Sequence, residues 1–121
     1  MPMTNMLKRS EFERKFALLV TKAALQNIHF VTTSFLRTPE QQKSLFDQGL
    51  SLCDGSFKKS MHQRGRARDI VIIDTEGNLI WEHTADYDFL GNTWEAMGGT
   101  HGGRWFKEGK TKFDDPYHFE M

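Results

Sequence analysis

The sequence predicts an α+β fold: a small single domain in which an antiparallel sheet is flanked by helices. The expected elements follow the order helix, strand, helix, hairpin, helix, strand, which is not the regular alternation of a doubly wound parallel sheet. The 121 residues are enough for one hydrophobic core, so we expect a single domain over residues 1–121. Ten Phe and three Trp indicate that large aromatic side chains build this core.

A helix is expected near the N-terminus, followed by a strand. Ser10 and Glu13 have the spacing of a capping box, which is typical of a helix start. The apolar residues that recur at helical spacing are Phe12, Phe16, Leu19, Val20 and Ala23. Residues 29–35 (HFVTTSF) are rich in β-branched side chains and predict a strand.

A second helix is expected after Thr38. Thr38 can act as its N-cap, and Pro39 suits the first helical position. Gln41 completes a second capping box, and Gly49 stands where a helix end is expected. Residues 50–61 predict an irregular loop.

The clearest strand pattern of the chain is residues 67–74 (ARDIVIID). Its run of Ile and Val is typical of a buried strand. A turn over residues 75–78 links it to residues 79–81, so we expect these two segments to form a β-hairpin.

A third helix is expected between residues 86 and 97. The side chains that recur there at helical spacing are Tyr87, Leu90, Trp94 and Met97. Gly91 and Asn92 weaken this helix. The glycine-rich stretch 98–103 predicts a loop, and residues 117–120 predict a short last strand.

The charge balance and the cysteine count exclude several classes of protein. Sixteen Lys and Arg against sixteen Asp and Glu give no net charge, which argues against a nucleic-acid partner and a polybasic membrane anchor. No segment approaches the roughly 20 apolar residues of a membrane span, so no stable membrane association is expected. The N-terminus lacks a signal-peptide pattern, which leads us to expect synthesis in a cytoplasm without an export route. The single cysteine, Cys53, excludes an intrachain disulfide and is expected to be structural.

Two of the five histidines have neighbours that suit a hydrolytic zinc site. Catalytic zinc takes three protein ligands and leaves a fourth position to water, whose pKa falls to about 7. His62, Asp69 and His118 could supply the three ligands. Asp115, held by Pro116, could take the proton of the water and pass it to the leaving amine. A carboxylate on a buried strand, such as that of Asp69, also needs a positive partner.

Other interpretations of these residues remain open on spacing alone. Asp69 could be neutralised by Arg66 or Arg68 instead of a metal. An Asp-Pro pair usually marks a turn, and Asp115 could merely cap one. A His seven residues before an Asp also occurs often by chance.

Four segments resemble a known family. The pattern Ser60-x-His62-x-x-Gly65-x-Ala67-x-Asp69 resembles the first zinc-binding motif of the D-alanyl-D-alanine carboxypeptidases and L-alanyl-D-glutamate endopeptidases. These zinc peptidases cleave peptidoglycan and share a fold with the signalling domain of hedgehog proteins. Residues 115–119 (DPYHF) resemble the second motif, residues 34–42 resemble the family's Arg followed by a Gln-bearing helix, and residues 102–105 (GGRW) resemble its Gly-Gly-x-Trp stretch. The resemblance runs from about residue 30 to the C-terminus.

The resemblance implies a hedgehog/DD-peptidase-like fold and a Zn²⁺ cofactor. It implies that His62, Asp69 and His118 bind the zinc ion. It also implies that Asp115 is the catalytic acid and base, and that Arg37 stabilises the negative charge that develops on the substrate carbonyl. The residues that it places near the substrate are Ser60, Gln41, His101 and Trp105.

Two residues depart from the family pattern. His101 stands where relatives usually have Trp, and we interpret it as a solvent-facing residue rather than a replacement in the substrate cleft. Tyr117 stands where many relatives have Pro, which could change the orientation of His118. His83 carries no motif and is interpreted as an ordinary strand-edge residue.

Together these features lead us to expect a zinc endopeptidase that cuts the bond between L-alanine and D-glutamate in the peptidoglycan stem peptide. We expect a monomeric phage or prophage endolysin, made in the host cytoplasm and acting in the periplasm after a holin opens the membrane. The alternatives are a D-alanyl-D-alanine carboxypeptidase and a zinc-bearing peptidoglycan-binding module without activity.

Overall fold

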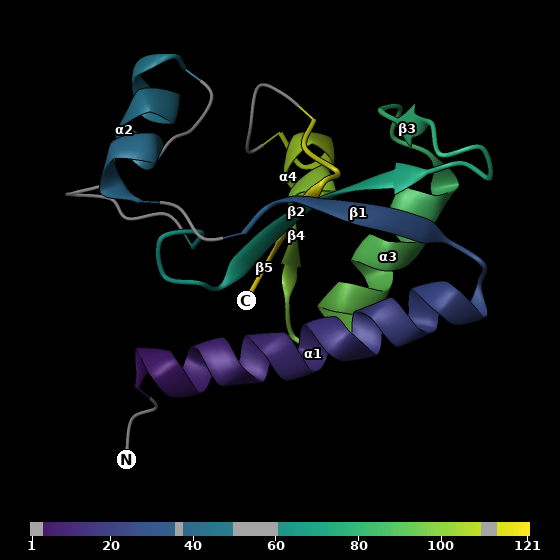
Figure 1. Ribbon diagram of the computed structural model, residues 1–121, viewed down its shortest axis with the longest axis horizontal. Helices are drawn as coiled ribbons and strands as arrows, with labels where there is room; N and C mark the ends of the chain where they lie inside the picture. The colour runs from purple at the N-terminus through teal and green to yellow at the C-terminus, as the bar shows by residue number, and fades with distance from the viewer. Residues whose placement is uncertain (1–3, 36–37, 50–60, 110–113) are drawn as a thin grey trace.

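The computed structural model describes residues 4–35, 38–49, 61–109 and 114–121, and for residues 105 and 106 the backbone alone. The elements in these ranges are α1 (Asn5–Leu25), β1 (His29–Ser34), α2 (Pro39–Asp47), β2 (Ala67–Ile73), β3 (Leu79–Ile80), α3 (Ala85–Ala96), β4 (Thr100–His101), α4 (Gly102–Lys107) and β5 (His118–Glu120) (Figure 1). The predicted α+β class, with helices flanking an antiparallel sheet, is confirmed. No helix in the described ranges has the length and apolarity to cross a bilayer.

Strand β2 is the centre of the sheet. The strand order is β1-β2-β5-β4, and β3 also pairs with β2, all of them antiparallel. The first residues of β2 pair with β5, and its last residues pair with β3. Asp69 consequently lies opposite Ser34 of β1 on one side and opposite His118 of β5 on the other.

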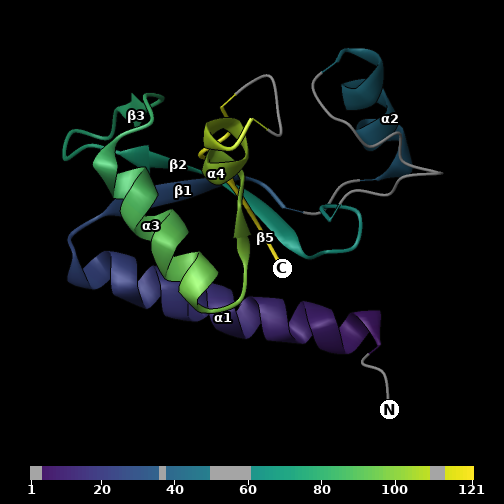
Figure 2. The same cartoon turned by 180° about the vertical axis from the view of Figure 1, so that it is seen from behind.

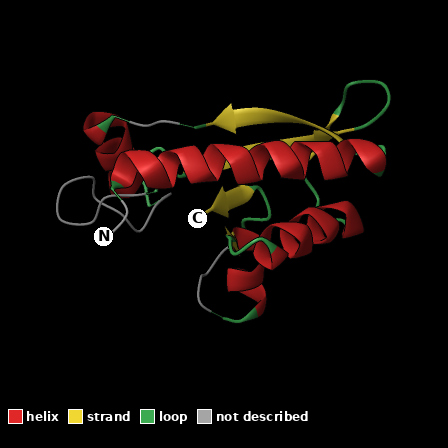
Figure 3. Ribbon diagram, turned by 90° about the horizontal axis from the view of Figure 1, so that it is seen from below, coloured by secondary structure: helices red, strands yellow, loops and turns green. Residues whose placement is uncertain are grey.

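The two faces of the sheet have different environments. Helix α1 lies across one face, and α3 rises from α1 toward β3 (Figures 2 and 3). Arg68 points toward α1, where it pairs with Glu13 at 2.7 Å and lies over the ring of Phe16. Because side chains alternate along a strand, Asp69 points to the opposite face. One strand therefore contributes to the core on one side and to a polar cluster on the other.

The core beneath the sheet consists of aromatic and aliphatic side chains from α1, α3, β2, β5 and the turn before β1. Its buried members are Phe12, Phe16, Leu19, Ala23, Ile28, Ile70, Ile72, Tyr87, Leu90, Trp94 and Phe119. The rings of Phe12 and Trp94 meet edge to face at 5.4 Å, and Trp94 also contacts Phe119. The indole N–H of Trp94 donates to the carbonyl of Glu120 at 2.8 Å, and this hydrogen bond connects α3 to β5. The predicted aromatic core is confirmed.

Helix α1 begins earlier than predicted. Thr4 is its N-cap, with its hydroxyl accepting from the amide of Leu7 at 3.2 Å, and Ser10 lies inside the helix. The capping box expected at Ser10 is therefore wrong, because the preceding residues also support a helix and Thr4 provides the cap. Val20 is 44% exposed and does not belong to the core.

Helix α2 begins and ends as predicted. The side chain of Thr38 accepts from the amide of Gln41 at 3.1 Å, and the side chain of Gln41 accepts from the amide of Thr38 at 2.9 Å. Gly49 follows the helix with a positive φ of 74°. The loop expected over residues 50–61 lies almost entirely outside the described residues.

The glycine-rich stretch after α3 is more ordered than predicted. It contains β4 and the start of α4 instead of a loop throughout. Pairing of His101 with Phe119 of β5 holds β4 in place, a tertiary contact that the local sequence does not reveal. The third helix, the hairpin and the last strand lie where the sequence predicts them.

Candidate metal centre

Three segments bring the predicted metal ligands together. His62 lies in a turn before β2, closed by hydrogen bonds from the amide of Arg66 to the carbonyl of Met61 and from the amide of Gly65 to the carbonyl of His62. Asp69 lies in β2, and His118 begins β5. Antiparallel pairing of β2 with β5 places Asp69 and His118, which are 49 residues apart, in register.

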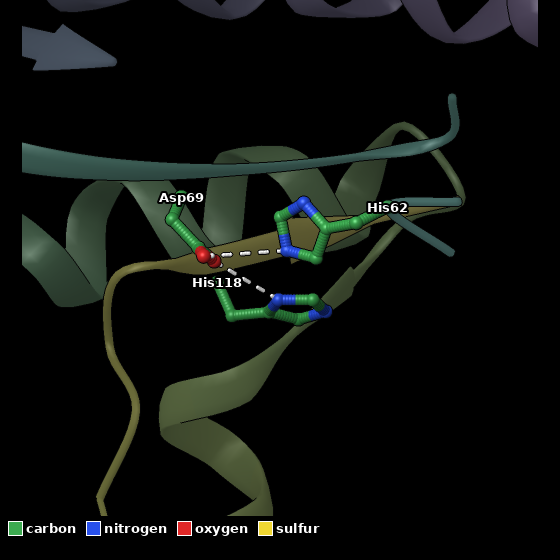
Figure 4. A group of neighbouring side chains, drawn as sticks. All are labelled: His62, Asp69 and His118. Carbon is green, nitrogen blue, oxygen red and sulfur yellow. Dashed lines mark hydrogen bonds and ion pairs between the residues drawn. The ribbon is translucent and has the colours of Figure 1, made fainter. Parts of the chain in front are cut away.

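The ligand atoms of these three residues converge (Figure 4). One nitrogen of each imidazole and one carboxylate oxygen lie within 4.8 Å of one another. Nε2 of His62 is 3.3 Å from Asp69 Oδ2, and Nδ1 of His118 is 3.1 Å from Asp69 Oδ1. The predicted grouping of two histidines and one aspartate is thus present, with the donor set that zinc prefers.

The second ring nitrogen of His62 determines which nitrogen is available to a metal. Nδ1 is 2.8 Å from the carbonyl oxygen of Phe35, which can only accept, so Nδ1 carries the hydrogen. The lone pair of Nε2 then points at Asp69. The His62 side chain is 1% exposed, and within the described residues Nε2 has no hydrogen-bond partner. Such an atom is costly to bury, and a metal ion is a partner that fits it.

His118 is oriented in a similar way by Glu120. Nε2 of His118 is 2.9 Å from Glu120 Oε1, which leaves Nδ1 directed at Asp69. Glu120 is on the same face of β5 because it lies two residues further along the strand. Zinc-binding histidines typically donate their other N–H to a carboxylate or a carbonyl in this manner.

The protein without metal holds the cluster together by charge. Burial favours the neutral form of Asp69, but its contacts with His118 and His62 outweigh burial and hold its pKa well below the usual range. Burial also opposes the charge on His118, yet hydrogen bonds to Asp69 and Glu120 raise its pKa to about 9. A proton on His118 therefore stabilises the cluster where a metal ion would otherwise do so.

Neither arginine considered as a partner of Asp69 contacts it in the described structure. Arg68 lies on the other face of the sheet with Glu13, and Arg66 donates from Nε to the carbonyl of Met121 at 2.7 Å. The charge of Asp69 is met by the proton on His118 instead, while Nε2 of His62 faces its other oxygen at 3.3 Å.

Asp115 lies in the turn that leads into His118. The amide of His118 is hydrogen-bonded to the carbonyl of Asp115 at 3.3 Å, and the charge of Asp115 contributes to the raised pKa of His118. A side chain at Gly102 would clash with the carbonyl of Asp115, so only glycine lets α4 approach this turn. Tyr117 donates its hydroxyl hydrogen to the carbonyl of Trp81, and His118 still faces Asp69 despite this departure from the family pattern.

The structure does not describe the side chains of most of the remaining predicted site residues. Arg37 and Ser60 lie outside the described residues, as does Cys53, and only the backbone of Trp105 is described, in α4. Gln41 caps α2.

His101 does not face solvent as predicted. It is 4% exposed, with its ring 4.7 Å from that of Phe119, because β4 pairs with β5 and turns the side chain into the core.

Sequence reasoning missed two polar residues, Glu120 and His83. The position of Glu120, two residues after a ligand on the same strand, was a usable signal. His83 is not at a strand edge: its side chain is 14% exposed, with Nδ1 2.6 Å from Asp114 and Nε2 2.7 Å from Asp88. No local pattern could reveal this, because Asp114 is 31 residues away.

Neither a protein-family model nor a curated protein sequence matches this chain. Solved structures nevertheless share its fold. The L-Ala D-Glu endopeptidase ChiX of Serratia marcescens aligns with a TM-score of 0.69 and 21% identity, over 93% of this chain and 78% of that one. The vancomycin-resistance D,D-pentapeptidase VanY of a VanB-type cassette was solved in complex with Zn(II). It has a TM-score of 0.62 and 19% identity, over 92% of this chain and 70% of that one. The LD-carboxypeptidase LdcB has a TM-score of 0.64 and 22% identity, over 92% of this chain and 57% of that one.

The expected fold is therefore confirmed, because the chain shares it with these solved peptidases. The three ligand candidates of this chain converge on the sheet face opposite α1 within that fold.

Proposed function

We propose that this chain is a zinc-dependent peptidase that hydrolyses an amide bond in the peptidoglycan stem peptide. The observation that carries the proposal is the convergence of His62, Asp69 and His118, in which the buried Nε2 of His62 lacks any described hydrogen-bond partner. The fold, shared with peptidases that act on peptidoglycan, supports it.

The residues of the chain divide the chemistry between them. A zinc ion at this site would supply a Lewis acid for the scissile carbonyl and lower the pKa of water to about 7. Asp115 accepts the proton that the attacking water loses and returns it to the leaving amine. Arg37 meets the negative charge that develops on the carbonyl oxygen, as the family resemblance implies. Ser60 and Trp105 are proposed to contact the substrate.

We further propose that the bond cut is the one between L-alanine and D-glutamate. The similarity to ChiX, an endopeptidase of this specificity, supports this choice. VanY has also been solved with D-alanine-D-alanine, so removal of a terminal D-alanine is the alternative outcome of the same experiment.

Digestion of purified muropeptides, with zinc or with chelator, tests this proposal. Mass spectrometry of the products is expected to show zinc-dependent loss of the peptide after L-alanine. Release of free D-alanine would identify a carboxypeptidase instead. One zinc per chain without any cleavage would leave only a binding module and would overturn the proposal.

Three variants assign the roles. His62→Ala and Asp69→Ala should lose both zinc and activity. Asp115→Ala should keep its zinc while its turnover falls by about 100-fold or more, because a general acid and base contributes that much. Asp86→Ala, on the exposed side of α3, is the matched control and should behave like the wild type. Substantial activity in Asp115→Ala would remove this residue from the mechanism.

We also propose that the protein acts as a monomeric phage or prophage endolysin. This role rests on the expectations from the sequence and makes a separate prediction. Purified protein should lyse Gram-negative cells whose outer membrane has been permeabilised, and the Asp115→Ala variant should not. Sedimentation analysis would reveal whether the active species is a monomer.

A further inference from the structure

We propose that His83 and His101 form a clamp that positions Asp115 for proton transfer. We call these two side chains the clamp. Its role belongs to the function proposed above and rests on it. The two histidines hold the residues on either side of Asp115: His83 holds Asp114, and His101 holds Pro116.

His101 fixes the backbone immediately after Asp115. Its Nε2 is 2.6 Å from the carbonyl oxygen of Pro116, and since a carbonyl can only accept, Nε2 carries the hydrogen. Burial lowers the pKa of His101, which keeps the ring neutral. The ring is buried against Phe119 on the core side of the sheet, so His101 does not contact substrate and acts through the turn.

Glycines provide the space that His101 occupies. A side chain at Gly91 of α3 would clash with the ring, and one at Gly103 of α4 would bring its Cβ to 2.7 Å from Cε1 of His101. The same Cβ would lie 2.9 Å from Cε1 of His83. The helices α3 and α4 are thus shaped around the two rings, which lie 6.4 Å apart.

His83 fixes the residue immediately before Asp115. Its Nδ1 contacts Asp114 at 2.6 Å and its Nε2 contacts Asp88 of α3 at 2.7 Å. Lys107 of α4 also contacts Asp88, at 2.9 Å. Asp114 is therefore tied through His83 to both helices.

The combined effect is to fix the backbone of Asp115 on three sides. Gly102 allows close packing of α4 against its carbonyl, while the clamp holds the residues before and after it. Proton transfer requires a general base within hydrogen-bond reach of the water, and a misplacement of about 1 Å can cost about 100-fold in rate. A rigid turn is a means to keep Asp115 within that reach.

Two variants at His101 separate positioning from packing. His101→Phe keeps a ring between the glycines but removes the N–H, whereas His101→Gln loses the ring and keeps an N–H for the carbonyl of Pro116. If the clamp positions Asp115, His101→Phe should lower kcat on muropeptides by about 10- to 100-fold with little change in KM. His101→Gln should retain kcat within about threefold. Both variants should retain one zinc per chain.

The opposite order of activities would overturn the proposal, because a purely structural role requires the ring and not the hydrogen bond. Equal activity of both variants and the wild type would overturn it as well. Should His101→Phe fail to fold, Asp114→Asn replaces it, since this half-buried side chain keeps its shape and loses only the charge that faces His83. That variant should lower kcat about tenfold, and an unchanged kcat would count against the clamp.

Crystal structures of the zinc-loaded variants test the clamp without activity. In His101→Phe, the carboxylate of Asp115 should be displaced from the metal site relative to the wild type, and in His101→Gln it should not. An undisplaced carboxylate in His101→Phe would refute the clamp. A wild-type protein that cleaves no muropeptide would refute the proposed function, and these structures would still decide on the clamp.

Discussion

His118 holds a proton in the metal-free protein that a metal ion would have to replace. Asp69 and Glu120 on either side of the ring overcome the effect of burial and raise the pKa of His118 to about 9. The usual value of a histidine is about 6.5. A group whose folded pKa is raised stabilises the folded state fully below its unfolded pKa, and this contribution is lost as the pH rises through the folded pKa.

The metal-free protein should therefore lose stability between about pH 6.5 and pH 9. Chemical denaturation in the presence of chelator would measure the free energy of unfolding across this range. Glu120→Gln removes one of the two carboxylates that hold the proton, so its curve should fall less steeply. Identical slopes for the two proteins would show that Glu120 does not help to hold the proton on His118.

Zinc affinity should depend on Glu120. Glu120→Gln should weaken zinc binding by about 10- to 100-fold, because the partner of a ligating histidine orients the ring and raises its basicity. Competition with a fluorescent chelator at constant pH would measure the change. Glu76→Gln, in the exposed turn before β3, is the matched control. Equal affinities of the two variants would mean that Glu120 does not support the metal site.

At the scale of single residues, the candidate ligands could be predicted from the sequence, and so could Glu120 from its place on the same strand, whereas the burial of His101 could not. His62, Asp69 and His118 carry a recognisable motif spacing. The burial of His101 depends on a pairing with β5 and on glycines of two helices, and none of these contacts is visible near position 101.

At the scale of the elements, α1 fixes the sheet through a narrow strip of its surface. Phe12 is fully buried between the rings of Phe16 and Trp94, whereas Leu18 is 51% exposed. Phe12→Ala should lower the free energy of unfolding by about 3–5 kcal/mol through lost contacts and a cavity. Leu18→Ala should change it by less than about 0.5 kcal/mol. Thermal denaturation of both variants tests this, and similar losses would show that α1 is not packed as described.

The long elements could be predicted from sequence because each carries its own signals. Helix α2 has a complete capping box, and β2 has a dense run of Ile and Val. The start of α1 was placed wrongly because Thr4 and Ser10 both suit a cap and only the tertiary structure selects between them. The short elements β4 and α4 escaped prediction because they depend on tertiary contacts. Strand β4 pairs with β5, Gly102 packs against the carbonyl of Asp115, and Gly103 packs against His101 and His83.

At the scale of the whole molecule, a metal ion would join three separate segments of the chain. Ligand binding to the folded state alone stabilises it by about 2.7 kcal/mol at a free concentration of 100 times the Kd. Zinc should therefore raise the melting temperature, chelator should reverse the effect, and His62→Ala should abolish it. Differential scanning calorimetry would measure this. A melting temperature unaffected by zinc would indicate that no metal binds the folded protein.

Because β2 contributes side chains both to the core and to the candidate metal centre, its register determines both. Consecutive residues of this strand face opposite sides of the sheet, with Arg68 beside Phe16 and Glu13 of α1 and Asp69 beside the two imidazoles. A slip by a single position against its neighbours would exchange the two, burying a carboxylate among phenylalanines and presenting a guanidinium to the metal. Mispaired molecules would be unstable and would lack the candidate metal centre, so formation of this centre and correct strand registration should be gained or lost together.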